Sequence, residues 1–163
     1  MTSAQITYPI TVYYDHSCVL CRSEILHIKA RDELGSIVLI DCSASDFDDS
    51  QLPHTKAELL ARIHAQDDRG NWLVASDVFV ALYSTVGLHG IASAWRIGKP
   101  VAEKMYPWIA RNRHVISKLG VHKLFNFMTE RHLKQKAQVA MQQSQACKDD
   151  ACKVDSEIRQ NKL

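Results

Sequence analysis

The fold can be inferred from two hydrophobic runs, Ile10-Thr-Val-Tyr-Tyr14 and Ile37-Val-Leu-Ile40. The first is rich in β-branched and aromatic residues and the second is purely aliphatic, which is typical of short strands. Between them, from Cys18 to Leu34, apolar residues recur near helical spacing, and Gly35 supplies a stop. These patterns predict a β-α-β unit. Because such crossovers are right-handed and join neighbouring strands, we expect the two strands to be adjacent and parallel.

The chain after this unit predicts a second group of elements. A capping box, Thr55-x-x-Glu58, indicates the start of a short helix. Two short apolar runs, at residues 63–65 and 72–74, flank a turn-rich segment and predict a hairpin. Ser76 is expected to cap a helix that ends at Gly87. The expected fold class is therefore α/β, with a β-α-β then β-β-α core.

Every pattern after this core is helical. Pro100 is expected at a helix start, and Pro107 is expected to kink or break the helix. We therefore expect a core over residues 7–90 and a helical extension over residues 91–141 that packs on the core. Residues 142–163 are polar, and we expect them to form a frayed helix or a disordered tail.

The composition is that of a single globular domain. The chain has 163 residues, of which 46% are hydrophobic and 23% are charged. Its 20 Lys and Arg residues nearly balance its 18 Asp and Glu residues. The net charge therefore gives no argument for nucleic acid or an anionic membrane as a partner, and we expect no nucleic-acid partner.

We expect neither a secretory signal nor a membrane span. Residues 1–9 contain no basic region followed by an apolar one, so a cytoplasmic location is expected. The run from Val78 to Trp95 lacks charge for 18 positions, but Gly87 and Gly90 divide it, which favours a buried helix followed by a turn. Five cysteines, an odd count, argue against a disulfide framework and favour free thiols in a reducing compartment.

The sequence Cys18-Val19-Leu20-Cys21 carries the chemistry. It follows the first predicted strand and opens the first predicted helix, the context in which Cys-x-x-Cys indicates a thioredoxin-like redox motif. The positive end of the helix dipole stabilises a thiolate on the first cysteine. We expect Cys18 to be the exposed nucleophile and Cys21, one turn further on, to be the resolving thiol. Such exchange requires no cofactor.

Two polar residues precede the motif. Asp15 has two possible roles, which are compatible with each other: an N-terminal cap of the helix, or a proton acceptor for one thiol during exchange. As a nearby negative charge it would oppose thiolate formation, so it cannot act simply as an activator. His16 in its charged form would favour the thiolate, but a solvated histidine at the turn is the preferred interpretation.

A third cysteine, Cys42, follows the second strand as Cys18 follows the first. Parallel strands place both at one edge of the sheet, so Cys42 is expected near the pair. Three sulfurs with His16 would be chemically sufficient for tetrahedral zinc, but a second Cys-x-x-Cys is absent, so we predict no metal site. Cys147 and Cys152 lie in the polar tail at a spacing that suits neither one helical face nor a zinc knuckle.

Three motifs together resemble the DCC family of thiol-disulfide oxidoreductases over residues 7–119. They are Tyr14-Asp15-x-x-Cys18-x-x-Cys21, Gly70-Asn71-Trp72, and Ala110-Arg111-Asn112-Arg113-His114 preceded by Tyr106. The resemblance implies a thioredoxin-like fold and a small redox protein. It also implies that the family's aspartate and two cysteines are Asp15, Cys18 and Cys21. For the residues 111–113 we favour helix capping and packing.

The preferred hypothesis is a cytoplasmic thiol-disulfide oxidoreductase. Its Cys18-Cys21 pair would exchange with a protein or with a low-molecular-weight thiol or disulfide. One alternative is a non-catalytic thioredoxin-like binding module in which the cysteines are passive. A less favoured alternative is a metal-handling protein that uses both of these cysteines and Cys42.

Overall fold

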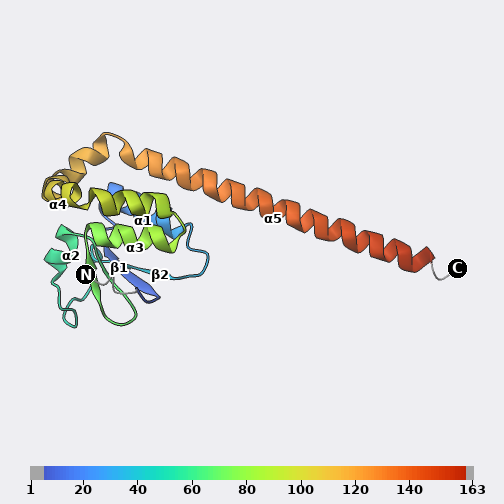
Figure 1. Cartoon of the computed structure of the whole chain (residues 1–163), viewed down its shortest axis with the longest axis horizontal. Helices are drawn as coiled ribbons and strands as arrows, with labels where there is room; N and C mark the ends of the chain where they lie inside the picture. The colour runs from blue at the N-terminus through green and yellow to red at the C-terminus, as the bar shows by residue number, and fades with distance from the viewer. Residues whose placement is uncertain (1–5, 161–163) are drawn as a thin grey trace. The chain divides into compact units, whose positions relative to one another are not determined.

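The computed structural model describes the backbone of residues 6–160, and the side chains of this range except those of residues 106, 110, 113–114, 117–118 and 145–160. Within residues 6–160, nine elements follow one another (Figure 1): β1 (Ile10–Tyr14), α1 (Val19–Lys29), β2 (Ile37–Asp41), α2 (Lys56–Ala61), β3 (His64–Gln66), β4 (Trp72–Val74), α3 (Ser76–Thr85), α4 (His89–Lys118) and α5 (Val121–Gln160).

The four strands form one mixed sheet with the order β2-β1-β3-β4. Strands β1 and β2 are parallel, with Ile10 opposite Ile37. Strand β3 is antiparallel to β1, and β4 is antiparallel to β3. The predicted β-α-β then β-β-α order is confirmed, and the fold is thioredoxin-like.

The sheet has an apolar layer on each face, because neighbouring residues of β1 point to opposite sides. Ile10 and Val12 pack in one cluster with residues of α1 and α3, whereas Tyr13 packs in a second cluster with Leu59 of α2. Helix α2 begins with the predicted capping box, in which Thr55 and Glu58 exchange hydrogen bonds between side chain and backbone. Helices α1 and α3 thus cover one face, and α2 covers the other.

Helix α1 is shorter than the sequence pattern predicted. It ends at Lys29, so the expectation that the helix continued through Leu34 was wrong, and that side chain is 89% exposed. The reason is Asp32, whose carboxylate accepts hydrogen bonds from the backbone N–H groups of Ser36 and Ile37. These bonds turn the chain directly into β2.

The sequence predicted that Ser76 caps helix α3, but the structure shows that it does not. The N-cap residue is Ala75, which makes no capping hydrogen bond through its side chain, and Ser76 is already the first helical residue. Ala75 has a φ of 53°, an uncommon conformation for a residue other than glycine. The short connection from β4 to α3 therefore depends on the backbone conformation of Ala75 and not on a side-chain cap.

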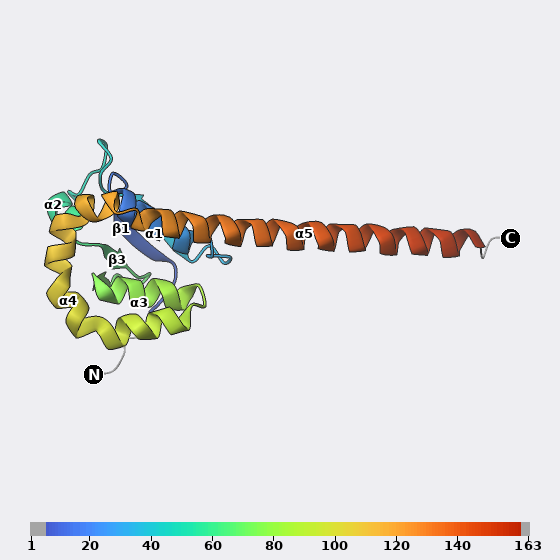
Figure 2. The ribbon, with the colours of Figure 1, turned by 90° about the horizontal axis from the view of Figure 1, so that it is seen from above.

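Helix α4 runs without interruption through both prolines, so the predicted new helix start at Pro100 was wrong, and Pro107, where a kink or a break was expected, does not break the helix. A proline removes one backbone hydrogen bond and bends a helix without necessarily ending it, and Figure 2 shows α4 changing direction part-way along its length. The helix lies beside α3, where Trp95 stacks on Phe79 at 4.8 Å between ring centroids and Lys99 pairs with Asp77 at 2.7 Å.

The chain forms two compact units, residues 1–126 and residues 127–163. The first unit contains the sheet together with α4, while the second consists of the remainder of α5. A frayed helix or a disordered tail was expected over residues 142–163; residues 142–160 are helical, and residues 161–163 lie outside the described residues. The division at residue 90 stays a prediction. None of the helices in the described part of the chain combines the length and apolar character that a membrane crossing requires.

We expect the two faces of α1 to respond differently to truncation. Ile28 is 1% exposed in the core and Leu26 is 42% exposed on the same helix. Ile28→Ala should lower the free energy of unfolding by about 2–5 kcal/mol because it leaves a cavity. The matched control Leu26→Ala should change it by about 0.5 kcal/mol or less. Urea denaturation measures both, and equal losses would contradict the packing described.

Candidate active site

The turn between β1 and α1 brings the two motif cysteines together. Cys18 is the N-cap residue of α1, and its sulfur accepts a hydrogen bond from the backbone N–H of Cys21 at 3.4 Å. The Cys21 thiol donates to the same sulfur at 2.7 Å. Two thiols at this separation on one helical turn can form a disulfide with little backbone movement.

The exposure of the two cysteines is opposite to the prediction. Cys18 is 0% exposed, whereas Cys21 is partly exposed. The expectation of an exposed Cys18 was wrong because an N-cap side chain that accepts from its own helix folds back over the helix end. Cys21, on the first turn, faces a cavity instead.

Hydrogen bonds distinguish the two sulfurs electrostatically. The sulfur of Cys18 accepts from both the backbone N–H and the thiol of Cys21, and it lies at the positive end of α1. Donors that point at a group favour its charged form. The arrangement therefore directs the donors of the helix end at Cys18 and not at Cys21.

Asp15 holds the turn that leads into the motif. It is 5% exposed, and its Oδ1 accepts hydrogen bonds from the Ser17 hydroxyl at 2.6 Å and the Cys18 backbone N–H at 3.2 Å. These are the contacts of a residue that fixes a helix entry. Asp15 and Cys21 both border the same cavity, so the structure places Asp15 near both cysteines.

His16 has a structural role in the turn. Its ring Nδ1 lies 2.8 Å from the Tyr14 hydroxyl, and its backbone N–H donates to Oδ1 of Asp41. Burial raises the pKa of Asp41, but hydrogen bonds from Ser43 and His16 outweigh it and hold this pKa below its usual range. A charged Asp41 therefore ties the end of β2 to the turn that precedes Cys18.

Glu24 is a site residue that the sequence analysis missed. Burial raises the pKa of Glu24 to about 7, although a hydrogen bond from the Tyr83 hydroxyl, at 3.2 Å, partly opposes this shift. Glu24 lies three residues after Cys21 on α1, and both border the same cavity. The i, i+3 spacing would have indicated this neighbour of the motif. The sequence does not indicate that Glu24 is buried, because its hydrogen-bond partner Tyr83 lies 59 positions away along the chain.

The cavity beside Cys21 has a volume of about 130 Å³ and a mainly apolar lining. The lining comes from α1, from the α2–β3 segment, and from Phe79, Trp95 and Ile109. An apolar cavity of about 150 Å³ in another protein admits a benzene-sized molecule. The space therefore suits one small apolar group next to the reactive sulfur.

Cys42 directly follows β2, and its expected closeness to the cysteine pair stays a prediction. Its backbone N–H donates to the Tyr14 carbonyl, and its side chain is 0% exposed between Tyr13 and Leu59. Burial, and then the charges of Asp41 and Asp15, raise the pKa of the Cys42 thiol to about 12. Such a thiol stays protonated and is a poor nucleophile.

Other candidate residues are not assembled with the cysteine pair. Within the described residues, no three His, Cys, Asp or Glu side chains come together in a way that could hold a metal ion. The side chains of Cys147 and Cys152 lie outside the described residues, as do those of Arg113 and His114 in the third family motif. In that motif, the Asn112 amide donates to a backbone carbonyl one turn earlier, which is a helix-stabilising contact.

Comparisons with known proteins agree with this geometry. An uncharacterized chloroplastic protein of Arabidopsis thaliana is 31% identical to the chain over 112 residues, which are 65% of this chain and 51% of that protein. The chain thus spans about half the length of this curated relative, and no solved structure matches it. Residues 12–119, more than half of the chain, match the family model described as DCC1-like thiol-disulfide oxidoreductase. This chain belongs to the DCC1-like thiol-disulfide oxidoreductase family.

Proposed function

We propose that this chain is a thiol-disulfide oxidoreductase that cycles Cys18 and Cys21 between a dithiol and a disulfide. The observation that carries the proposal is the 2.7 Å contact between the two sulfurs, one buried at the end of α1 and the other facing a cavity. The family match supports the general reaction class.

The exposure of the sulfurs supports Cys21 as the thiol that meets the substrate. In the reductive direction, Cys21 loses its proton and its thiolate attacks one sulfur of the substrate disulfide. The substrate S–S bond breaks, a new bond joins Cys21 to one half, and the other half leaves as a thiolate that takes up a proton. This role assignment reverses the one expected from the sequence.

Cys18 then acts as the resolving thiol. Its thiolate, favoured by the donors at the helix end, attacks the Cys21 sulfur and forms the Cys18-Cys21 disulfide. The second substrate half leaves as a thiolate and is protonated. The substrate gains two electrons and two protons, and the enzyme pair is oxidised by the same amount. The reverse steps oxidise a substrate dithiol.

Glu24 is the proposed proton acceptor for Cys21. A carboxyl group whose pKa lies near 7 exists in both protonation states at neutral pH, which suits proton transfer in either direction. Asp15 is assigned a positioning role, because its Oδ1 already accepts two hydrogen bonds from the turn. No cofactor takes part in these steps.

The cavity supports a substrate with an apolar group beside its reacting sulfur. Its lining is mainly aliphatic and aromatic, and it is large enough for one small side chain. A protein or a small thiol or disulfide compound with such a group would place its sulfur at Cys21. We further propose that the protein works in the cytoplasm, where a reducing environment keeps both cysteines available.

Single cysteine variants should trap different species. Because Cys21 is the accessible sulfur, Cys18→Ser should accumulate a mixed disulfide on Cys21 when given a small aromatic disulfide. Cys21→Ser should form such an adduct at least about tenfold more slowly, because Cys18 is buried. Intact-mass spectrometry follows both adducts, with Cys42→Ser as the matched control that should leave exchange unchanged. Faster trapping on Cys18 would reverse the assignment, and no adduct in either variant would contradict the proposed function.

Glu24→Gln should slow exchange about tenfold or more near neutral pH, because the amide cannot accept a proton from Cys21. The wild-type rate should rise through pH 7 as Glu24 ionises, and the variant should lack this step. Asp15→Asn is the matched control, since its amide oxygen can still accept the bonds of the turn, and its rate should remain close to wild type. A wild-type pH profile in Glu24→Gln would refute the proton-acceptor role.

A second measurement on Glu24→Gln is independent of activity. Because the folded-state pKa of Glu24 is raised, the folded protein holds this proton more tightly than the unfolded chain. Protonated Glu24 therefore stabilises the folded state. This contribution to the free energy of unfolding is fully present below about pH 4, and roughly 3 kcal/mol is lost as the pH rises through 7. Denaturation from pH 5 to 8 should show a steeper loss in wild type than in Glu24→Gln.

A further inference from the structure

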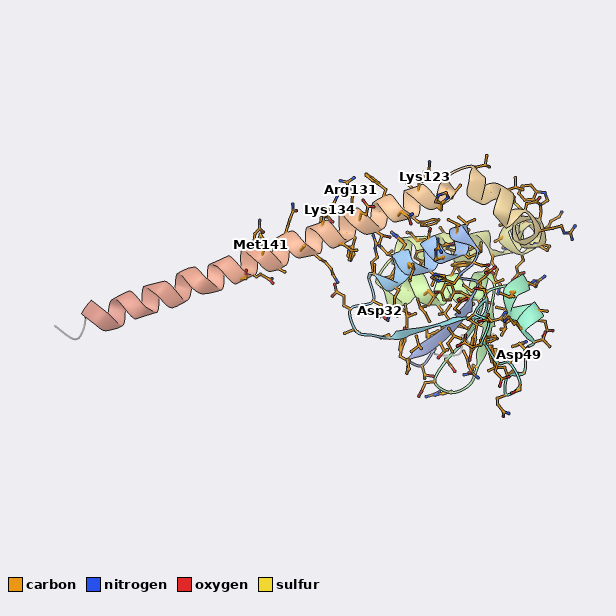
Figure 3. The ribbon with its side chains drawn as sticks, turned by 180° about the vertical axis from the view of Figure 1, so that it is seen from behind. Asp32, Asp49, Lys123, Arg131, Lys134 and Met141 are labelled. Carbon is orange, nitrogen blue, oxygen red and sulfur yellow. The ribbon has the colours of Figure 1, made fainter. Side chains whose placement is uncertain are left out.

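The two ends of the sequence carry opposite charge, which the near-neutral total conceals. Residues 1–95 contain 6 Lys and Arg against 12 Asp and Glu, and residues 96–163 contain 14 against 6. Figure 3 labels Asp32 and Asp49 in the acidic part, and Lys123, Arg131 and Lys134 on α5 in the basic part. Such segregation is typical of a protein with a charged binding surface.

Helix α4, which lies in the basic half of the sequence, carries an exposed apolar stripe. The stripe consists of Val101, Met105, Trp108 and Val115, with Val101 63% exposed and Trp108 60% exposed. The spacings of four, three and seven residues place these side chains on one face of the helix. A different face of α4 packs inward, where Trp95 and Ile109 border the cavity. The stripe residues therefore do not pack in the core.

Cations lie beside the stripe. Lys104 and Arg111 are both exposed, and each lies four residues before a stripe residue, Trp108 and Val115 respectively. The segment from residue 96 to residue 123 contains 7 Lys and Arg against a single acidic residue, Glu103. An apolar face with an exposed tryptophan, flanked by cations, is the pattern of a helix that lies in the interface of an anionic bilayer.

Other occupants fit this face less well. A second copy docked along the stripe would bring Lys104 and Arg111 close to the same residues of its partner, which is unfavourable. Nucleic acid would engage the cations but would leave the apolar stripe in water. A bilayer accepts both features, because its headgroups are anionic and its acyl boundary is apolar.

We propose that the second half of α4 binds the surface of anionic membranes, with Trp108 and its apolar neighbours inserted among the lipids and Lys104 and Arg111 at the headgroups. The helix lies on the bilayer and does not cross it. This binding goes beyond the exchange reaction and does not depend on it. The net charge of the chain gave no argument for an anionic membrane as a partner, whereas the distribution of charge along the chain supports one.

The test uses the full chain and flotation with vesicles of phosphatidylcholine, with or without phosphatidylglycerol. The protein should bind only vesicles that contain phosphatidylglycerol, and raised salt should release it. Trp108→Ser should weaken binding by about tenfold or more. Lys104→Ala and Arg111→Ala should each weaken it by about fivefold. Because these side chains are exposed, far-ultraviolet circular dichroism should show unchanged folding.

Matched controls lie outside α4. Leu34→Ser and Arg69→Ala alter exposed residues of the same chemistry and should leave vesicle binding unchanged. The proposal would be overturned by equal binding to neutral vesicles, by no binding to either kind, or by wild-type binding of Trp108→Ser. It would also be overturned by a dimer in sedimentation that Trp108→Ser disperses, or by preferential binding of duplex DNA that Trp108→Ser retains.

Discussion

The hydrogen bonds at the β1–α1 turn are the constraint on which the site depends. Asp15 accepts from the backbone N–H of Cys18, and Cys18 in turn accepts from that of Cys21. Asp41 fastens the same turn to the end of the neighbouring parallel strand through His16. Without this chain of bonds, the N-terminus of α1 would have unpaired donors and the two sulfurs would have no fixed separation.

Burial acts on three groups near this turn with different consequences. It raises the pKa of Glu24 to about 7, which makes that carboxyl able to exchange protons near neutrality. The same effect raises the pKa of Cys42 to about 12, with added repulsion from Asp41 and Asp15, and so removes that thiol from the chemistry. Cys18 is also buried, but it receives two hydrogen-bond donors. The partners of each group, and not burial alone, therefore determine its role.

The strands and the motif were predictable because they depend on local patterns. The runs that became β1 and β2, and the Thr55-Glu58 capping box, gave correct elements. One error, the length of α1, arose where a side chain changed the path of the backbone. Asp32 ended α1 early by bonding to backbone groups of the next strand.

The site was predictable only in part. Asp15, Cys18 and Cys21 were identified from the motif and the structure brings them together. The prediction that Cys18 is exposed was wrong, because the spacing of two cysteines does not indicate the direction in which an N-cap side chain points. Glu24 was missed because its pKa depends on burial created by contacts distant in sequence.

The most direct measurement of the central claim is disulfide mapping of the oxidised protein. Free thiols are alkylated before and after unfolding, and peptides are identified by mass spectrometry. The account predicts one bond between Cys18 and Cys21, with Cys42 alkylated only after unfolding because it is buried and protonated. A bond from Cys42 to either cysteine, or a pair that stays reduced in an oxidising glutathione buffer, would contradict the account.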